Sequence, residues 1–566
     1  MSRHTKRILT IVFLAVFFAN QACGYYELAN SRKRGLRHNS IETILQLDDD
    51  KIDLATAVLV LSRDWGTTKT LHSYRRKIDL MAQEILRRAE QKQIQHDAEI
   101  IPLINEYLFS ELGFKSVETA DNPEDLFLHS VIDKKRGYCL SLSVLYLSIA
   151  ERIGLPLYGV VVPGHFFVRY DDGEIRFNIE TTSDGRNASD KHYKDKFKPP
   201  AGEDSVYMKN LTNRQTLGCF FNNLGNSYSI IQELDYAQIE LERAVTVTPN
   251  LAEGHTNLGN TYLTKGFLQD ALYEYAIAID ILPTDPKTHN NMANAYNQLG
   301  EPAKAIVSYK RAIKIDRNFS DAHRNLAGTY LGLSSLKKAL SEIKKARKID
   351  PKDPATQRLL GDIYSSMNKF DLAIPAYRKA LKLNPNDAGA CTNLGYAYLN
   401  NSQTHDAVSW LTIAIQLEPL NTNAYFGLAN AYNKLGQLAD EITTYQQLLE
   451  IQPNAVVAMQ NLGNAYMNQK SFDDAVETYI QAIALAPENP DIYYNLGVAY
   501  INLNLFADAI AQYDKTIELS PKNAAAYNGL AIGYYMMKNK EMAQKHARTA
   551  TKLGFKVQKK LLDAIK

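Results

Sequence analysis

The sequence predicts a mostly α-helical protein, in which a smaller α+β domain precedes an all-α superhelical solenoid. Three observations lead to this fold class. The second half of the chain repeats one short phrase every 34 residues, the segment before it changes from helical to strand-like patterns, and a chain of 566 residues exceeds what one core holds. We therefore expect at least two domains.

The repeated phrase first reads Asn223-Leu224-Gly225-Asn226-Ser227-Tyr228 and occurs in ten copies. Its central apolar residue, which we call the marker, recurs without a slip at Leu224, Leu258, Met292, Leu326, Leu360, Leu394, Leu428, Leu462, Leu496 and Leu530. Such a period is typical of a solenoid, whose units bury their apolar faces against their neighbours. We expect ten two-helix units over residues 218–554 and a C-terminal capping helix over residues 555–566.

Small residues, tyrosine and proline recur at fixed places in these units. In the second unit they are Gly259, Tyr262, Ala271 and Pro283. The pattern resembles the tetratricopeptide repeat. That resemblance implies a right-handed superhelix of helical hairpins, with a concave groove lined mainly by the first helix of each unit. We expect these positions to serve packing rather than chemistry.

Asparagines recur one residue before and two residues after the marker. On a helix these positions are i and i+3, so both project from one face. They are Asn223, Asn226, Asn257, Asn260, Asn291, Asn294, Asn325, Asn393, Asn430, Asn461, Asn464 and Asn495. Because an amide donates and accepts hydrogen bonds, such a ladder suits the backbone of an extended peptide, and the resemblance supports this because asparagine ladders in some tetratricopeptide proteins hold peptide backbone. The alternative is that these amides make only inter-repeat hydrogen bonds.

The overall composition is ordinary for a globular protein. Hydrophobic residues make up 45% of the chain and charged residues 22%, and the formal net charge of +2 gives no global argument for nucleic acid. We therefore expect protein or peptide partners. The four scattered cysteines share no disulfide or zinc spacing, and no metal or cofactor is expected. Oligomeric state is not indicated.

The N-terminus has the pattern of a secretory signal over residues 1–23. Basic residues precede an apolar run of twelve residues, Ile8–Ala19, which is short for a membrane span. Cys23, directly after Ala22, resembles the lipid-modified cysteine of bacterial lipoproteins. Ordinary cleavage nearby, for example after Gly24, is the alternative. We expect export to the periplasm or cell envelope, with the membrane contacted only through an N-terminal lipid anchor.

Residues 40–197 read as helices followed by short strands, which indicates an α+β domain. Helical patterns cover Ile52–Leu61, Tyr74–Gln91, Ile100–Leu112 and Leu140–Ile153, and strand patterns cover Leu157–Val162, His165–Tyr170 and Glu174–Ile179. The proline-containing residues 198–204 indicate a linker, and we expect a lead-in helix from Val206 to Leu217.

Three residues of this domain are candidates for a nucleophilic site. Cys139 stands at the start of a predicted helix, where the helix dipole favours a thiolate. His165 begins the second strand and Glu180 ends the third, so antiparallel pairing brings them side by side. A thiolate, an imidazole base and a carboxylate that orients it make up a generalised triad. The alternative is a small buried cysteine and a structural histidine.

The residues around this triad are similar to the transglutaminase-like superfamily, and closest to its bacterial SirB1-type branch. The similar stretches are Gly137-Tyr138-Cys139-Leu140-Ser141-Leu142-Ser143, Arg152-Ile153-Gly154-Leu155-Pro156, Pro163-Gly164-His165-Phe166-Phe167-Val168-Arg169 and the helical Asn105-Glu106-Tyr107-Leu108-Phe109. The resemblance implies a cysteine-protease-like fold, with Cys139 as nucleophile and His165 as base. Glu180 falls where the family usually has Asp, and Tyr138 and Leu140 replace the usual flanking Gln or Trp.

The chemistry that this resemblance implies is acyl transfer from an amide to water or an amine. One hypothesis is an exported enzyme, a protease, amidase or cross-linker, that acts on peptides held by the repeat groove. A second is a non-catalytic interaction scaffold with an inactive domain. A third class, a carbohydrate or cell-wall binder, is also open, because peptidoglycan offers amides too. The substrate and the acyl acceptor are not indicated.

Overall fold

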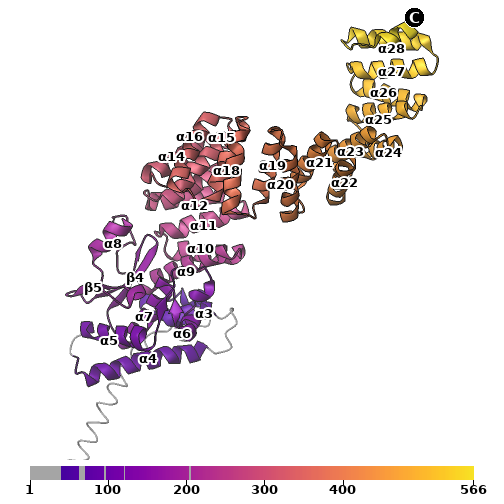
Figure 1. Cartoon of the computed structure of the whole chain (residues 1–566). Coiled ribbons are helices and arrows are strands. Elements are labelled where there is room, and N and C mark those ends of the chain that lie inside the picture. Colours follow the sequence, from indigo (N-terminus) through magenta and orange to yellow (C-terminus); the bar gives the residue numbers. More distant parts are fainter. Residues whose placement is uncertain (1–39, 63–70, 95–96, 120, 203–204, 566) are drawn as a thin grey trace, which may run out of the picture. The chain divides into compact units, whose positions relative to one another are not determined.

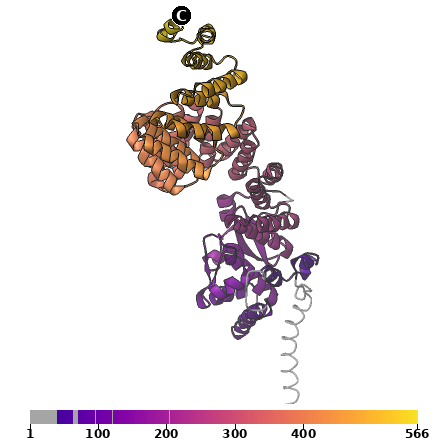
Figure 2. The ribbon, with the colours of Figure 1, turned by 90° about the vertical axis from the view of Figure 1, so that its right-hand side faces the viewer.

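Figures 1 and 2 show the computed structural model of the chain, which describes residues 40–62, 71–94, 97–119, 121–202 and 205–565. The predicted signal peptide, with its candidate lipidation site Cys23, lies outside the described residues. The described part is mostly helical, as predicted, and it divides into two compact units, residues 1–322 and 323–566. No helix within the described ranges is long and apolar enough to cross a bilayer.

Helices form the larger part of the smaller domain. They are α2 (Ile41–Ile44), α3 (Leu54–Leu61), α4 (Leu71–Gln91), α5 (Ile101–Asn105), α6 (Leu128–Lys134), α7 (Cys139–Ile153) and α8 (Asp190–Phe197). Helix α3 begins after Asp53, whose carboxylate caps it by accepting a 2.7 Å hydrogen bond from the Thr56 N–H. The helix predicted over Ile100–Leu112 is present, but after α5 it continues as a π-helical segment, Glu106–Glu111.

A three-stranded antiparallel sheet follows α7, in the order β3 (Leu157–Val162), β4 (His165–Asp171) and β5 (Arg176–Ile179). The predicted turns, at Gly164 and at residues 171–173, join neighbouring strands. Strand β5 begins two residues later than predicted. The reason is that Asp172 Oδ1 accepts hydrogen bonds from the N–H groups of Glu174 and Ile175, at 2.9 and 2.6 Å, and so holds both residues in the turn.

The segment between the smaller domain and the repeats is not the predicted lead-in helix. Residues 206–211 run alongside β3 instead, where the N–H groups of Met208 and Leu211 donate to the carbonyls of Val161 and Gly159 at 3.0 and 2.9 Å. The prediction of a helix from residue 206 is therefore wrong. A sheet edge supplies the backbone partners of this segment, which local sequence periodicity does not reveal.

Helix α9 (Asn213–Ile230) merges the end of the predicted lead-in helix with the first helix of the first repeat. It starts at a capping box, in which Thr212 and Gln215 bond each other's backbone N–H groups. Leu217, Phe220 and Phe221 are fully buried and belong to the same hydrophobic core as the residues of α7. The smaller domain and the first repeats therefore share one core.

Ten helical hairpins follow the smaller domain, one for each predicted unit. They are α9 with α10 (Leu234–Val247), α11 (Ala252–Lys265) with α12 (Leu268–Ile281), α13 (Pro286–Gln298) with α14 (Pro302–Ile315), α15 (Ser320–Gly332) with α16 (Leu336–Ile349), α17 (Pro354–Ser366) with α18 (Phe370–Leu383), α19 (Ala388–Asn400) with α20 (Thr404–Leu417), α21 (Thr422–Leu435) with α22 (Leu438–Ile451), α23 (Val456–Gln469) with α24 (Phe472–Leu485), α25 (Pro490–Asn502) with α26 (Phe506–Leu519), and α27 (Ala524–Met536) with α28 (Lys540–Lys552). The structure thus confirms a mostly α architecture.

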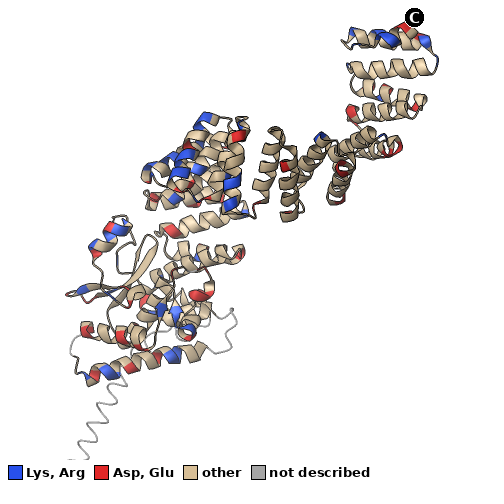
Figure 3. Ribbon diagram, in the orientation of Figure 1, with Lys and Arg blue, Asp and Glu red and all other residues tan. Residues whose placement is uncertain are grey.

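The last hairpin is covered by a short C-terminal helix, α29 (Lys559–Ala564). Val557 and Ile565, on either side of it, are buried in a cluster with Ala547 and Ala550 of α28. The solenoid end is therefore capped by apolar contacts. In the second compact unit, helix α16 is strongly basic, with six Lys or Arg residues and one Glu (Figure 3).

The small residues of the repeats lie where two helices approach closely. A Cβ atom added at Gly259 in α11 would lie 2.7 Å from the ring of Tyr275 in α12. Tyr275 is fully buried, and its hydroxyl donates to Asn260 Oδ1 at 2.8 Å, so the ring has little room to move. The same conflict recurs at Gly361 with Tyr377.

We expect Gly259→Ala to destabilise the first compact unit by about 1–2 kcal/mol, because overpacking against Tyr275 outweighs the gain in helix propensity. Gly254→Ala, in the same helix, is the matched control. Its added Cβ would meet Val245 at 3.4 Å, an ordinary contact, so its stability should be equal or higher. Thermal unfolding followed by far-UV circular dichroism measures both. Equal melting temperatures for the two variants would contradict this packing argument.

Candidate functional site

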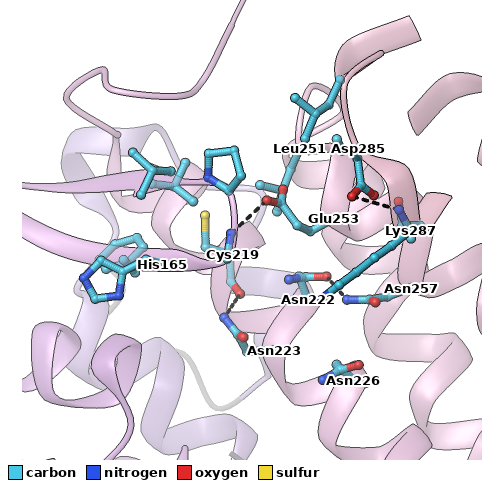
Figure 4. Close-up of a pocket in the computed structure, with 18 of the residues that line it drawn as sticks. His165, Cys219, Asn222, Asn223, Asn226, Leu251, Glu253, Asn257, Asp285 and Lys287 are labelled. Atoms are coloured by element: carbon cyan, nitrogen blue, oxygen red, sulfur yellow. Dashed lines mark hydrogen bonds between the residues drawn. The ribbon is translucent and has the colours of Figure 1, made fainter. Parts of the chain in front are cut away.

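A pocket of about 520 Å³ lies in the first compact unit, between the smaller domain and the first three repeats (Figure 4). The domain side is lined by Tyr138, Cys139, Val161, Val162, Pro163, Gly164, His165 and Phe166. The repeat side is lined by Cys219, Asn222, Asn223, Asn226, Leu251, Ala252, Glu253, Thr256, Asn257, Asn260, Leu282, Asp285, Lys287 and Asn291. Two of the three predicted triad residues and five of the twelve predicted ladder asparagines therefore line the same pocket.

Cys139 is the first residue of α7, and its side chain is buried at 5% exposure. The N–H groups of a first helical turn have no intrahelical acceptor, and together with the helix dipole they favour negative charge on the sulfur. Before α7, β2 (Arg136–Gly137) pairs in parallel with β1 (Lys115–Ser116), a sheet that was not predicted. A Cβ atom at Gly137 would lie 2.7 Å from Ser141 Oγ, so this approach to the cysteine requires glycine.

His165 and Glu180 meet across neighbouring strands, side by side as the sequence predicts. His165 begins β4 and Glu180 directly follows β5, and His165 Nε2 lies 2.6 Å from Glu180 Oε2. Glu180 also accepts hydrogen bonds from the Thr182 hydroxyl at 2.6 Å and from the Tyr193 hydroxyl at 3.0 Å. Although burial raises the pKa of Glu180, the bonds from His165 and Thr182 lower it below its ordinary value. The carboxylate is therefore ionised and held in one orientation.

Two of the aromatic side chains around His165 come from α8 and were missed by the sequence analysis, and Phe167 of β4 also stacks on His165, at 6.4 Å. The His165 ring stacks on Phe197, with ring centroids 5.4 Å apart, and on Tyr193 at 6.2 Å. Burial and the neighbouring Glu180 raise the pKa of Tyr193, so its hydroxyl keeps the proton that it donates. Tyr193 and Phe197 stand at i and i+4 on α8, and this spacing was the available signal.

The Asn105 motif supports the turn that follows Glu180. Asn105 Nδ2 donates to the Gly185 carbonyl at 3.2 Å, and Asn105 Oδ1 accepts from the Tyr146 hydroxyl of α7 at 2.9 Å. Within the turn, the Glu180 N–H donates to the Arg186 carbonyl at 2.9 Å. These bonds connect the predicted helical motif to the carboxylate of the site.

The charge state of His165 follows from its surroundings. Burial lowers the pKa of His165, but the hydrogen bonds to Cys139 and Glu180 raise it by more than burial lowers it. The pKa of His165 is therefore about 9 instead of 6.5. His165 therefore carries its proton at neutral pH, and its positive charge stabilises negative charge on the neighbouring sulfur.

No group of three or more His, Cys, Asp or Glu side chains is arranged for a metal ion in the part of the chain that the structure describes.

The amides of the repeat wall are linked from one repeat to the next. Asn257 Nδ2 donates to Asn222 Oδ1 at 2.9 Å, and Asn291 Nδ2 donates to Asn260 Oδ1 at 2.8 Å. Asn222, one residue before the predicted row, was missed by the sequence analysis. Each amide has two N–H groups and two acceptor lone pairs, so these bonds leave hydrogen-bonding capacity for a ligand. The side-chain amide of Asn226 has no hydrogen-bond partner among the described residues, and Asn226 is partly exposed and lines the pocket.

In the second compact unit the same inter-repeat bonds recur. Asn495 donates to Asn464 at 3.2 Å, and Asn393 donates to Asp362, which occupies an Asn position, at 2.9 Å. Asn430 is exposed. The structure thus shows inter-repeat bonding for part of the ladder, and for the residues in the pocket it shows this bonding together with access to a shared cavity.

Comparisons with known proteins agree with this division of the chain. Residues 72–219 match the family model described as "Transglutaminase-like superfamily". Models described as TPR repeat or tetratricopeptide repeat match residues 286–319, 361–402, 392–456, 463–504 and 490–523.

Individual relatives cover parts of the chain. A UPF0162 protein of Xylella fastidiosa is 27% identical over 227 residues, which are 38% of this chain and 78% of that protein. The crystal structure of MamA is 28% identical, covers 29% of this chain and 96% of its own, and has a TM-score of 0.28. The C-terminal part of a TPR repeat-containing protein from Cytophaga hutchinsonii is 17% identical, with a TM-score of 0.39, 43% of this chain covered and 99% of its own.

The raised pKa of His165 predicts a pH dependence of stability. The contribution of protonated His165 to the free energy of unfolding is fully present below pH 6.5 and is lost as the pH rises through about 9. The melting temperature of the natural protein should therefore fall over this range more steeply than that of His165→Gln. His192→Gln, at an exposed position of α8, is the matched control and should follow the natural protein. Parallel curves for the natural protein and His165→Gln would contradict the assignment.

Proposed function

We propose that this chain, in which a transglutaminase-like domain at residues 72–219 is followed by tetratricopeptide repeats, binds extended peptide segments and carries out thiol-dependent acyl transfer on them. One observation carries the proposal. The candidate thiol, its histidine and the amides of the first three repeats line a single pocket. A segment bound along the amides therefore lies within reach of the sulfur.

The proposed reaction assigns one role to each of the three residues. The Cys139 thiolate attacks an amide carbonyl carbon, and the C–N bond breaks as His165 gives its proton to the leaving amine. A thioester on Cys139 remains. Neutral His165 then takes a proton from water or from a second amine as that group attacks the thioester, which releases the acyl product and the thiolate. Glu180 orients His165 and stabilises its charged form.

The backbone of α7 supports the same reaction. The N–H groups of its first turn lack intrahelical acceptors and adjoin Cys139, so they are the donors available to a developing oxyanion. They take the place of the Gln or Trp side chains that usually flank the cysteine in similar enzymes.

The burial of Cys139, at 5% exposure, favours the second candidate, an interaction scaffold without turnover. The N-terminal sequence supports the further proposal that the protein is exported.

Alkylation of the three described cysteines separates the two candidates. Burial raises the pKa of Cys219 and raises that of Cys391 to about 11, so both should react slowly with iodoacetamide at pH 7. We expect Cys139 to react at least about tenfold faster, because its neighbour His165 is charged. In His165→Ala this advantage should disappear.

Site-resolved mass spectrometry measures each rate within one sample, and the slow reaction of Cys391 serves as internal control. If Cys139 reacts no faster than Cys219 and Cys391, and His165→Ala reacts like the natural protein, the enzymatic proposal fails and the scaffold remains.

Peptide capture tests the groove. We expect the double variant Asn223→Ala, Asn226→Ala to bind a degenerate library of uncharged ten-residue peptides about thirtyfold more weakly, since each of the two lost hydrogen bonds contributes about 1 kcal/mol. Asn187→Ala, at an exposed position that does not line the pocket, is the matched control. Fluorescence anisotropy measures the affinities. Unchanged binding by the double variant would show that these amides serve the repeats alone.

A further inference from the structure

Glu253 connects the second repeat to the thiol site. It is the second residue of α11, and its carboxylate lines the pocket (Figure 4). One carboxylate oxygen accepts a hydrogen bond from the Tyr207 hydroxyl, and the other accepts from the Gly164 N–H at 3.2 Å. Burial raises the pKa of Glu253. A carboxylate withdrawn from water is costly unless it is hydrogen-bonded, so these two bonds account for its presence there.

Gly164, one of these two partners, lies directly before the histidine. Gly164 forms the turn between β3 and β4 with φ +76°, and His165 is the next residue. The N–H of a turn residue has no partner within the hairpin here, and Glu253 supplies one from another element. Since His165 pairs with Val162 at the first position of β4, a bond to the N–H of the preceding Gly164 restrains the backbone that carries the His165 ring.

The second partner holds the carboxylate in place. Tyr207 bridges to Val161 of β3, and its hydroxyl accepts a hydrogen bond from the Ala252 N–H of α11 at 3.0 Å. The start of α11, the segment alongside β3 and the β3–β4 turn are thus joined through one phenol and one carboxylate. The repeats approach the thiol site from this side, and both contacts lie within the first compact unit.

We propose that Glu253 is a positioning residue of the thiol site, which holds His165 against Cys139 through the Gly164 turn. The second repeat is then a part of the reactive centre as well as of the peptide groove. This inference rests on the proposed function, because it concerns the activation of the same cysteine. It assigns to Glu253 no contact with substrate.

The test is the pH profile of Cys139 alkylation by iodoacetamide in the full chain. We expect Glu253→Ala to lower the rate at pH 7 at least about tenfold and to change the pH profile of the rate, because His165 is no longer held beside Cys139. Glu253→Gln should retain a rate within about threefold of the natural one, since its amide oxygen still accepts from the Gly164 N–H. Glu274→Ala is the matched control. Glu274 lies 2.6 Å from His255 in the same repeat and has no bond to the turn, so its loss should leave the profile unchanged.

The outcomes distinguish this inference from the proposed function. If the natural protein shows a fast Cys139 and Glu253→Ala keeps both its rate and its pH profile, the inference is overturned while the proposed function stands. If Cys139 of the natural protein is slow, both fall together. Should Glu253→Ala melt far below the natural protein, Glu253→Asp decides. Its carboxylate is one methylene short of the Gly164 N–H, so a natural pH profile in that variant would overturn the inference.

Discussion

The pairing of residues 206–211 with β3 is the interaction on which the rest of the first unit depends. It gives β3 a partner on its outer edge and aims the chain into α9, so that the first repeat helix packs into the core of the smaller domain. Without this edge pairing, only a linker would join the repeats to the smaller domain. With it, the amides of α9, α11 and α13 face the strands that carry His165.

That arrangement places the buried thiol in a cavity that the first three repeats also line. Cys139 is almost fully covered, and its charged neighbour His165 is held by Glu180, Tyr193 and Phe197. Access comes from the repeat side, where neutral amides line the wall. Amides can bind backbone without selecting for charge, so the proposed peptide binding and the proposed thiol chemistry are assigned to different residues of one cavity.

Sequence periodicity predicted those parts of the fold that depend on local contacts. The 34-residue period located all ten hairpins, and the turn residues around Gly164 located the strands. Sequence periodicity did not predict contacts between residues that are far apart in the chain. The segment from Val206 was expected to be helical, and its pairing with β3 was missed because Tyr207 pairs with Val161, 46 residues earlier in the chain.

The site shows the same limit. Cys139, His165 and Glu180 were identified from their places at element ends and from a family resemblance, and His165 and Glu180 lie in contact. Tyr193 was not identified although it stands four residues before Phe197 on one helix face, and Glu253 was not identified because it bonds Gly164 from 89 residues away in the sequence. For the asparagines, sequence left two alternatives. The structure shows that one amide can bond a neighbouring repeat and still face the pocket.

We propose that one bound peptide occupies the groove and the thiol site together. A ten-residue uncharged peptide that carries a vinyl sulfone at one end and a photoreactive benzophenone side chain near the other tests it directly. If one peptide occupies both places, we expect a single adduct, attached to Cys139 and, after irradiation, also to residues of α9, α11 or α13. Attachment to Cys139 with photocrosslinks only outside these helices would contradict it.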